Sequence, residues 1–224
     1  MDWLALAVSL RLAFWTMAAL MVLGIPIACW VAFSRWRFKF LVEAVVALPL
    51  VLPPTVLGFY ILVAIGPRSP LGGAYQALTG KLLPFSFEGL LVASILYSLP
   101  FAVQPMAASF GAVDRRLLEA SYCLGAWRWT TFRRVILPLS VPGVVTGMVL
   151  SFAHTLGEFG VVLMVGGNLP GRTRTASVAI YDEVQALNYG AALETSLVLL
   201  GVSFGVLLVT YALQRKVWTA WPGK

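Results

Sequence analysis

Asp114-Arg115-Arg116-Leu117-Leu118-Glu119-Ala120-Ser121 opens a polar stretch that closes on Leu137-Pro138 and stands between two long apolar runs. A turn between membrane spans needs only a few residues, whereas this stretch is long and keeps apolar residues among its charges. Asp114 is a residue type that caps helix N-termini, and Gly125 is a type that ends helices in the left-handed conformation. We call residues 110–138 the polar loop and expect it to be a docking element. An ordinary amphipathic helix at the membrane surface is the alternative.

The composition is that of an integral membrane protein. Of the 224 residues, 60% are hydrophobic and 11% are charged, whereas soluble domains carry about 25% charged residues. One helical crossing requires about 20 apolar residues. We therefore expect an all-α, polytopic protein in which residues 1–224 form a single transmembrane domain. Five spans are predicted, at 4–33, 41–65, 89–108, 139–165 and 191–213.

Three segments of the sequence are not expected to form straight membrane-spanning helices. Pro49, Pro53 and Pro54 lie inside the second predicted span, which must therefore be kinked or locally unwound. Such breaks are tolerated where protein or a water-lined cavity satisfies the freed backbone groups. Residues 66–88 are predicted to form an exterior loop. Residues 166–190 are predicted to form an exterior or re-entrant segment whose helix is too short and polar to cross.

The net charge of +7 comes mostly from three short segments. Five spans place these segments on one side of the membrane, and the positive-inside rule makes that side the cytoplasm. The N-terminus is then outside and the C-terminus inside. Because the charges gather at these turns, nucleic acid is not an expected partner. The segments contain Arg35, Arg37 and Lys39; the five arginines of the polar loop; and Arg215, Lys216 and Lys224.

The chain lacks the motifs of an enzyme. The nearest string to a phosphate-binding loop separates Gly73 from Gly80-Lys81 by six residues instead of four, and Leu82 replaces the metal-binding hydroxyl. His154 is the only histidine, which excludes an H-E-x-x-H zinc site. We expect no catalytic residue, metal ligand or cofactor in this chain. Energy for transport must then come from a partner or an ion gradient.

The polar loop also carries a family resemblance. Glu119-Ala120-Ser121, Gly125, Val135 and Leu137-Pro138 follow the spacing E-A-A-x3-G-x9-I-x-L-P, with Ser121 and Val135 as small departures. This pattern resembles the signature of ATP-binding-cassette importer permeases, whose coupling helices seat in a cleft of a cytoplasmic ATPase. The resemblance assigns the coupling role to a set of residues in this loop. They are Asp114, Leu118, Glu119, Ala120, Ser121, Gly125, Leu137 and Pro138.

Two further stretches, 48–56 and 151–175, resemble the oxyanion branch of these permeases, with the molybdate permeases as the nearest group. The resemblance implies a type I importer permease fold in the inner membrane, and a homodimer of this chain. It also implies two ATPase subunits that bind ATP and Mg²⁺, and a soluble oxyanion receptor outside. Sulfate, thiosulfate and tungstate remain alternative cargoes. A stand-alone anion channel or an ion-coupled carrier is the alternative from another class.

The anion pathway has six candidate residues. Glu158 is a carboxylate inside a span, and we expect either a structural role, bonded to backbone or paired with an arginine, or repulsion of the anion at a gate. His154 precedes it by four residues, which predicts a shared helix face; a packed, hydrogen-bonded histidine is the alternative to a pathway role. Ser151 and Thr155 offer neutral donors, which suit a pathway better than tight ionic binding. Arg172 and Arg174 are predicted at the exterior mouth, to attract an anion or contact the receptor; the alternative is ordinary solvated charges.

Overall fold

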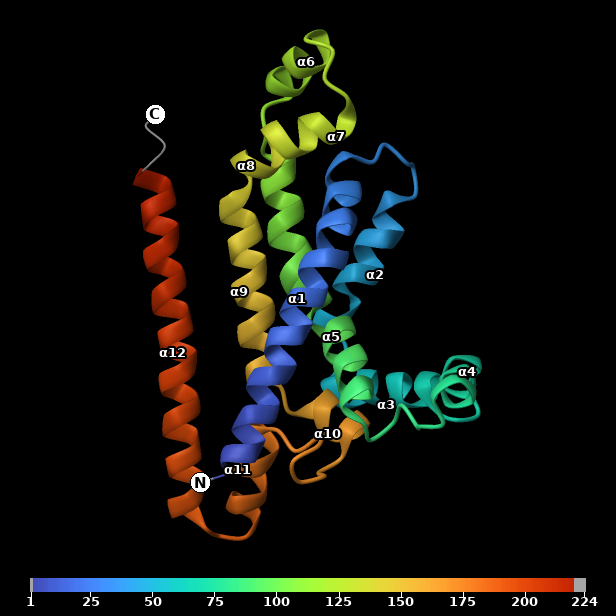
Figure 1. Ribbon diagram of the computed structural model, residues 1–224, viewed down its shortest axis with the longest axis vertical. Helices are drawn as coiled ribbons and strands as arrows, with labels where there is room; N and C mark the ends of the chain where they lie inside the picture. The colour runs from blue at the N-terminus through green and yellow to red at the C-terminus, as the bar shows by residue number, and fades with distance from the viewer. Residues whose placement is uncertain (1, 220–224) are drawn as a thin grey trace.

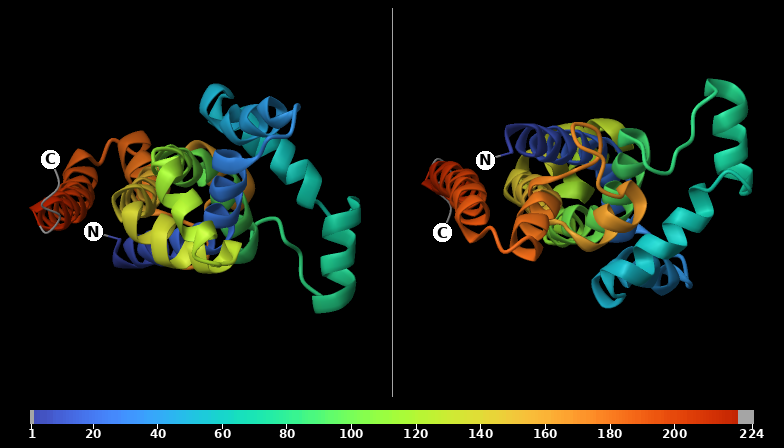
Figure 2. Two further views of the ribbon diagram at one scale, coloured as in Figure 1. Left: turned by 90° about the horizontal axis from the view of Figure 1, so that it is seen from above. Right: turned by 90° about the horizontal axis from the view of Figure 1, so that it is seen from below.

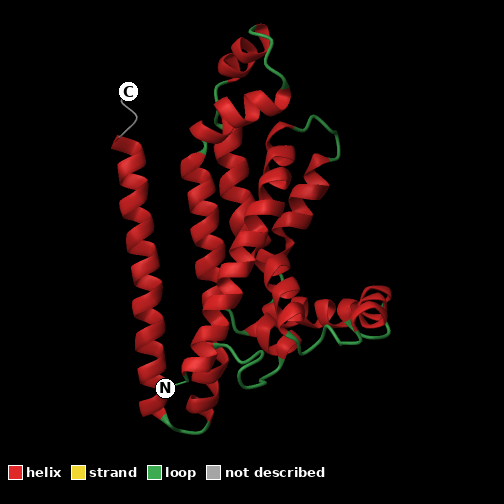
Figure 3. Ribbon diagram, in the orientation of Figure 1, coloured by secondary structure: helices red, strands yellow, loops and turns green. Residues whose placement is uncertain are grey.

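The computed structural model describes residues 2–219, and every regular element in this range is helical (Figures 1 and 3). The predicted all-α class is confirmed. The helices are α1 Trp3–Phe33, α2 Lys39–Val51, α3 Pro54–Ile65, α4 Pro70–Thr79, α5 Phe87–Gly111, α6 Arg115–Cys123, α7 Arg128–Thr131, a π-helical turn Phe132–Ile136, α8 Leu137–Leu139, α9 Val141–Gly157, α10 Gly160–Gly166, α11 Ala176–Gln185 and α12 Tyr189–Thr219.

The described range contains three helices, or up to five if each bent pair counts as one span, that are long and apolar enough to cross a membrane. The helices α1, α5 and α12 are each long and apolar enough to cross alone. Two further spans are bent helix pairs: α2 meets α3 at 116°, and the helical stretch 128–139 meets α9 at 73°. Counting each bent pair as one span gives the five crossings that the sequence predicts, although the second and fourth are not straight rods.

The break in the second span follows from its prolines. Pro53 disfavours helical backbone at Leu52, which is extended with φ −72° and ψ 136°. The chain restarts as α3 with Pro54 in its first turn, where the missing N–H leaves no partner unsatisfied. As a result α3 runs across the bundle instead of along it, and α3 and α4 project from one side of the molecule (Figure 2).

The span predicted at 139–165 is a shorter helix followed by a second break. Helix α9 ends at Gly157, Glu158 is extended with ψ 140°, and α10 begins at Gly160. The prediction of one continuous span was therefore wrong. The sequence contains no proline at this point that would have indicated the break. Helix α10 instead packs beside α3, near the end of the molecule that carries the N-terminus (Figure 1).

The centre of the bundle consists of α1, α5 and α9, which pack against one another. Small residues permit the close approach. A Cβ atom on Gly147 of α9 would stand 2.8 Å from the carbonyl oxygen of Ala102 in α5. Helix α12 packs on α9 and α11 at the outer edge, and it exposes large apolar side chains such as Phe204 to the surroundings. That exposure suits a lipid-facing helix.

The two ends of the molecule differ in composition. The polar loop, the 34–38 turn and the C-terminal end of α12 lie at one end, whereas the start of α1, α10 and α11 lie at the other (Figure 1). The basic segments at 35–39 and 114–134 therefore share one end, as predicted. The backbone of Arg215 and Lys216 belongs to the last turns of α12 at that end. Lys224 lies outside the described residues.

Candidate functional site

The polar loop contains a helix that is capped at both ends. The Asp114 Oδ1 atom accepts the backbone N–H of Arg116 at 2.9 Å, so Asp114 is the N-cap of α6. Gly125 has a φ of +78°, and its N–H donates to the carbonyl of Tyr122 while the N–H of Ala126 donates to that of Ser121. These two bonds form a Schellman motif. Both predicted caps are confirmed, and α6 is a defined element.

Helix α6 has no buried residue, and two of its predicted coupling residues contact other parts of the chain. Leu118 is half-buried and packs against the core cluster that includes Phe110. Ser121 is also half-buried, with its Oγ atom 2.9 Å from the Thr131 Oγ1 atom. The coupling role of these two residues stays a prediction. The exposed apolar groups of this region are Leu117, Tyr122, Leu124, Trp127 and Trp129.

The other predicted coupling residues lie around these exposed apolar groups. Glu119, Ala120 and Gly125 are exposed, as is Pro138, while Leu137 is half-buried. Leu124, directly before Gly125, is 88% exposed, more than any other large apolar residue whose side chain the structure describes. A face of this kind is unusual in water and typical of a surface that another protein covers.

The polar loop is tied to the bundle at both of its ends. Phe132 contacts Phe110 of α5 edge-to-face, with ring centroids 5.9 Å apart. The Ser140 Oγ atom donates to the Ser109 carbonyl at 3.2 Å, and Ser109 donates in return to the Ser140 carbonyl. These contacts join the end of α5 to the start of α9.

Of the predicted pathway residues, His154 is packed inside the chain. Its Nδ1 atom lies 3.0 Å from the Ser98 Oγ atom, and its ring stacks on Phe101 with centroids 3.9 Å apart. The Tyr97 ring lies on a further side. The stacking and the hydrogen bond support a structural role for His154.

The hydroxyl groups of Ser151 and Thr155 also have partners within the chain. Thr155 donates to the Ser151 carbonyl at 2.9 Å, and its Oγ1 atom lies 2.9 Å from the Ser98 Oγ atom. Ser151 donates to the Met148 carbonyl. Both residues are buried, so in this conformation neither hydroxyl faces a surface at which an anion could pass.

Glu158 occupies a different position from the predicted one. Because α9 ends at Gly157, Glu158 does not share a helix face with His154, and that prediction was wrong. Its side chain is 5% exposed. Neither carboxylate oxygen has a hydrogen-bond or arginine partner among the described residues.

Glu158 is one of several buried polar side chains that the sequence pattern did not reveal. Thr16 of α1, Ser94 of α5 and Glu158 are each buried, with no hydrogen-bond partner in the described part of the chain. Leu12, Leu90 and Val162 share one apolar cluster between α1, α5 and α10.

Helix α3 presses closely on α10 at the level of the two span breaks. A Cβ atom on Gly58 would lie 2.8 Å from the Met164 Cβ atom and 3.2 Å from the Val161 Cα atom. Only glycine permits this approach, since real Cβ atoms do not come so close to other heavy atoms. The helices that follow the break after α2 and the break after α9 therefore pack directly against each other.

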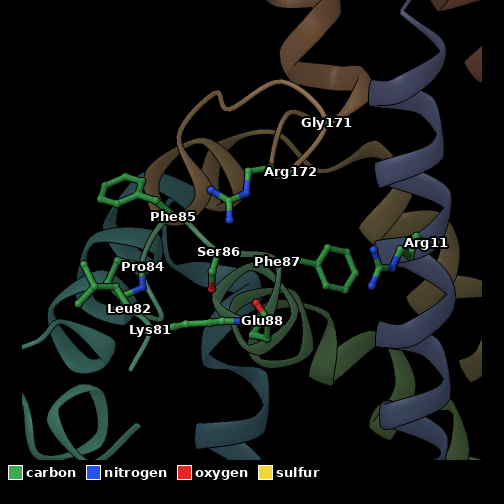
Figure 4. Close-up of a pocket in the computed structure, with 10 residues that line it drawn as sticks. All are labelled: Arg11, Lys81, Leu82, Pro84, Phe85, Ser86, Phe87, Glu88, Gly171 and Arg172. Atoms are coloured by element: carbon green, nitrogen blue, oxygen red, sulfur yellow. The ribbon is translucent and has the colours of Figure 1, made fainter. Parts of the chain in front are cut away.

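The two predicted mouth arginines have different surroundings. Arg174 is held in ion pairs, 3.0 Å from Asp182 and 3.6 Å from Asp2, and thus ties α11 to the start of α1. Arg172 instead lines an open pocket at this end of the molecule together with Arg11 and Lys81 (Figure 4).

The charged residues that line the pocket in Figure 4 are mostly basic. The Arg11 guanidinium lies 4.3 Å from the centroid of the Phe87 ring, a cation–π contact that fixes its direction. Arg172 and Lys81 reach the same opening, and Glu88 is the one carboxylate that lines it. Lys81 was not among the predicted site residues, because only the fold brings the 81–88 segment beside 171–172.

Comparison with known proteins places these features in a family. Residues 24–219 match the family model described as binding-protein-dependent transport system inner membrane component. The molybdenum transport system permease protein ModB of Azotobacter vinelandii is 51% identical over 96% of this chain and 95% of its own. ModB of Escherichia coli K12 is 36% identical over 82% and 80%. A probable sulfate transport system permease protein of Chlorella vulgaris is 35% identical over 92% and 77%.

Solved structures of transporters share the fold. An alginate ABC transporter in complex with its periplasmic protein aligns with a TM-score of 0.75 at 18% identity, covering 96% of this chain and 78% of that one. An inward-facing methionine ABC transporter aligns with a TM-score of 0.74 at 17% identity, over 95% and 94%. The predicted permease fold is confirmed, and the chain belongs to the family of inner-membrane components of binding-protein-dependent transport systems.

Proposed function

We propose that this chain is the membrane-spanning permease subunit of an ATP-driven molybdate importer. Two relatives named as molybdenum permeases, at 51% and 36% identity, support this cargo. The relative named as a sulfate permease is less similar, at 35%. Sulfate, thiosulfate and tungstate are therefore secondary candidates. The chain itself performs no bond chemistry, and ATP and Mg²⁺ are held by a partner ATPase.

The observation that carries the proposal is the capped helix α6 with its exposed apolar face. Two copies of this chain present two such faces to two cytoplasmic ATPase subunits. Closure of the ATPases displaces α6, and the contacts Phe132–Phe110 and Ser140–Ser109 transmit the movement to α5 and α9. The two span breaks then allow an inner gate and an outer gate to exchange. The polar loop lies in the cytoplasm, and the N-terminus lies outside.

The basic pocket at the opposite end suits an anion importer. Arg11, Lys81 and Arg172 create a positive potential at the exterior mouth, which attracts an oxyanion released by a soluble receptor. Attraction here is long-range and weak, so it raises the local anion concentration without trapping the substrate. Arg174 does not contribute to this attraction, because its guanidinium is already ion-paired with Asp182 and Asp2.

The docking of α6 on the ATPase is tested by one substitution in α6, at Glu119, and one just after it, at Gly125. We expect Glu119→Lys and Gly125→Asp to abolish co-purification with the ATPase, because the first reverses a charge on the exposed helix and the second places a Cβ atom on a left-handed residue. Glu183→Lys on α11 is the matched control at the opposite end. Full coupled transport by both α6 variants would refute the docking role.

The cargo is tested with the complete transporter in proteoliposomes. We expect ATP-dependent uptake of radioactive molybdate that excess tungstate or molybdate suppresses and excess sulfate suppresses weakly. Suppression by sulfate at equal concentration would favour the sulfate alternative. Uptake by this chain without an ATPase, and with the polar loop dispensable, would establish a channel or ion-coupled carrier instead.

A further inference from the structure

We propose that a pocket between the 34–39 turn and helix α6 binds the headgroup of an anionic phospholipid. The pocket has a volume of about 330 Å³ and lies where the C-terminal end of α1 meets the start of the polar loop. The proposal rests on the proposed placement of this end of the molecule at the cytoplasmic membrane surface. It does not depend on the cargo or on the ATPase.

The charges that line the pocket favour an anion. Arg35, Lys39 and Arg115 line it together with one carboxylate, Glu119. Lys39 is partly neutralised, since its Nζ atom lies 3.3 Å from Glu43. Within the described side chains, no carboxylate stands within salt-bridge distance of either arginine. Two guanidinium groups from separate segments thus converge on one opening, and guanidinium is the side chain best suited to bind a phosphodiester.

The other walls of the pocket are apolar. Phe33, Val113 and Leu118 line it beside the cations, and Val113 and Leu118 belong to the core cluster of the bundle or pack against it. A free inorganic anion would gain nothing from such walls. A phospholipid, in contrast, places its phosphate between the arginines and its glycerol and acyl region along the apolar side.

Aromatic side chains place the neighbourhood of this pocket at the membrane interface. Trp30, Trp36 and Phe38 form a chain of edge-to-face contacts, with centroids 6.1 Å and 5.6 Å apart. All three are exposed on the single chain. Tryptophan and other amphipathic rings concentrate at headgroup level, where one side of the ring is apolar and the other is wet. The pocket is therefore at the depth where lipid phosphates lie.

A protein occupant is less suitable for this pocket. Of the exposed apolar side chains that would meet a partner protein, Leu117 and Leu124 do not line the pocket, whereas Tyr122 does. Leu118, which does line it, faces the core of the bundle. A bound headgroup would join Arg35, which follows α1, to Arg115 in the first turn of α6. It would thereby hold α6 against the bundle.

The test measures lipid retention by the assembled transporter. The complex is purified, exposed to equal amounts of phosphatidylglycerol and phosphatidylcholine, and examined by native mass spectrometry. We expect selective retention of phosphatidylglycerol, weakened roughly fivefold by each of Arg35→Gln and Arg115→Gln, because one basic group near a membrane surface contributes about 1 kcal/mol. Arg35→Lys should retain most of the binding, which separates loss of charge from misfolding.

The chain offers matched controls for both arginines. Arg37→Gln and Arg116→Gln remove the same charge one or two residues away, from side chains that do not line the pocket. Equal loss in all four glutamine variants would show unspecific attraction and overturn the proposal, as would unchanged retention in Arg35→Gln and Arg115→Gln. Displacement of the lipid by inorganic phosphate would identify a free-anion site. Loss of the ATPase from these two variants, with lipid retention unchanged, would identify a protein contact.

Discussion

A Cβ atom on Gly160 would stand 2.6 Å from the Cβ atom of Pro54, so the start of α10 is seated directly on the start of α3. Each residue stands just after a break in a membrane span, Pro54 after the α2–α3 break and Gly160 after the α9–α10 break. Because the two breaks touch, we expect a rearrangement of one to require a rearrangement of the other. A gate built on either break would therefore involve both.

The first prediction concerns this contact. We expect Gly160→Ala to destabilise the permease by about 1–3 kcal/mol, since the added methyl group overpacks the contact with Pro54. Thermal unfolding of the purified chain in detergent measures the change. Gly157→Ala is the control, because nothing lies within 4 Å of the methyl group that it would add. Equal melting temperatures for the two variants would contradict the role of the contact.

The second prediction separates two serines one turn apart on α5. Ser98→Ala should lower the free energy of unfolding by about 1–3 kcal/mol, because it leaves the Nδ1 atom of His154 without its partner and removes the contact with Thr155. Ser94→Ala should be neutral or slightly stabilising, because the Ser94 hydroxyl is buried without a partner in the described range. Chemical denaturation of both variants gives the comparison, and a larger loss for Ser94→Ala would refute it.

The third prediction separates two arginines at the end of the molecule opposite the polar loop. Arg172→Gln should slow uptake roughly two- to tenfold at low ionic strength and much less at high salt, because it removes part of the attractive field. Its melting temperature should not change. Arg174→Gln should instead lower stability by about 1 kcal/mol or less, since it removes partly exposed ion pairs with Asp182 and Asp2. Salt-dependent loss of uptake in Arg174→Gln, together with loss of stability in Arg172→Gln, would show that Arg174 belongs to the mouth.

The fourth prediction concerns orientation. Cys123, at the end of α6, is exposed, whereas Cys29 in α1 is half-buried. In a Cys29→Ser background, a membrane-impermeant maleimide should label Cys123 in inside-out vesicles and not in intact cells. A cysteine that replaces Asn188, an exposed residue between α11 and α12 at the opposite end, should show the reverse. Labelling of Cys123 from outside would overturn the proposed topology.

The helix caps of the polar loop could be predicted because they are local. The bonds of Asp114 to Arg116 and of Gly125 to Tyr122 join residues two or three positions apart, so neighbouring sequence is sufficient to specify them. The contacts that half-bury Leu118 and Ser121 could not be predicted in the same way. Leu118 packs against the core cluster that includes Phe110, and Ser121 lies beside Thr131, so both depend on residues from other segments.

The candidate pathway residues show more clearly the difference between what neighbouring sequence specifies and what distant contacts decide. Residue type and span position were enough to single out His154 and Glu158, since polar groups inside a span are rare and demand an explanation. Their roles depend on distant partners. Ser98, far away in the sequence, makes His154 a packed residue, and the end of α9 removes Glu158 from the predicted shared face.

The amino-acid sequence was sufficient to establish a helical membrane protein with its basic turns at one end, because hydrophobic length and charge placement are properties of single segments. It also specified the capped helix in the polar loop. The position of the second break, the packing of Gly160 on Pro54 and the burial of Glu158 came only from the tertiary structure. Each depends on residues that are distant in sequence and adjacent in space, and no local pattern records which distant helix will lie alongside.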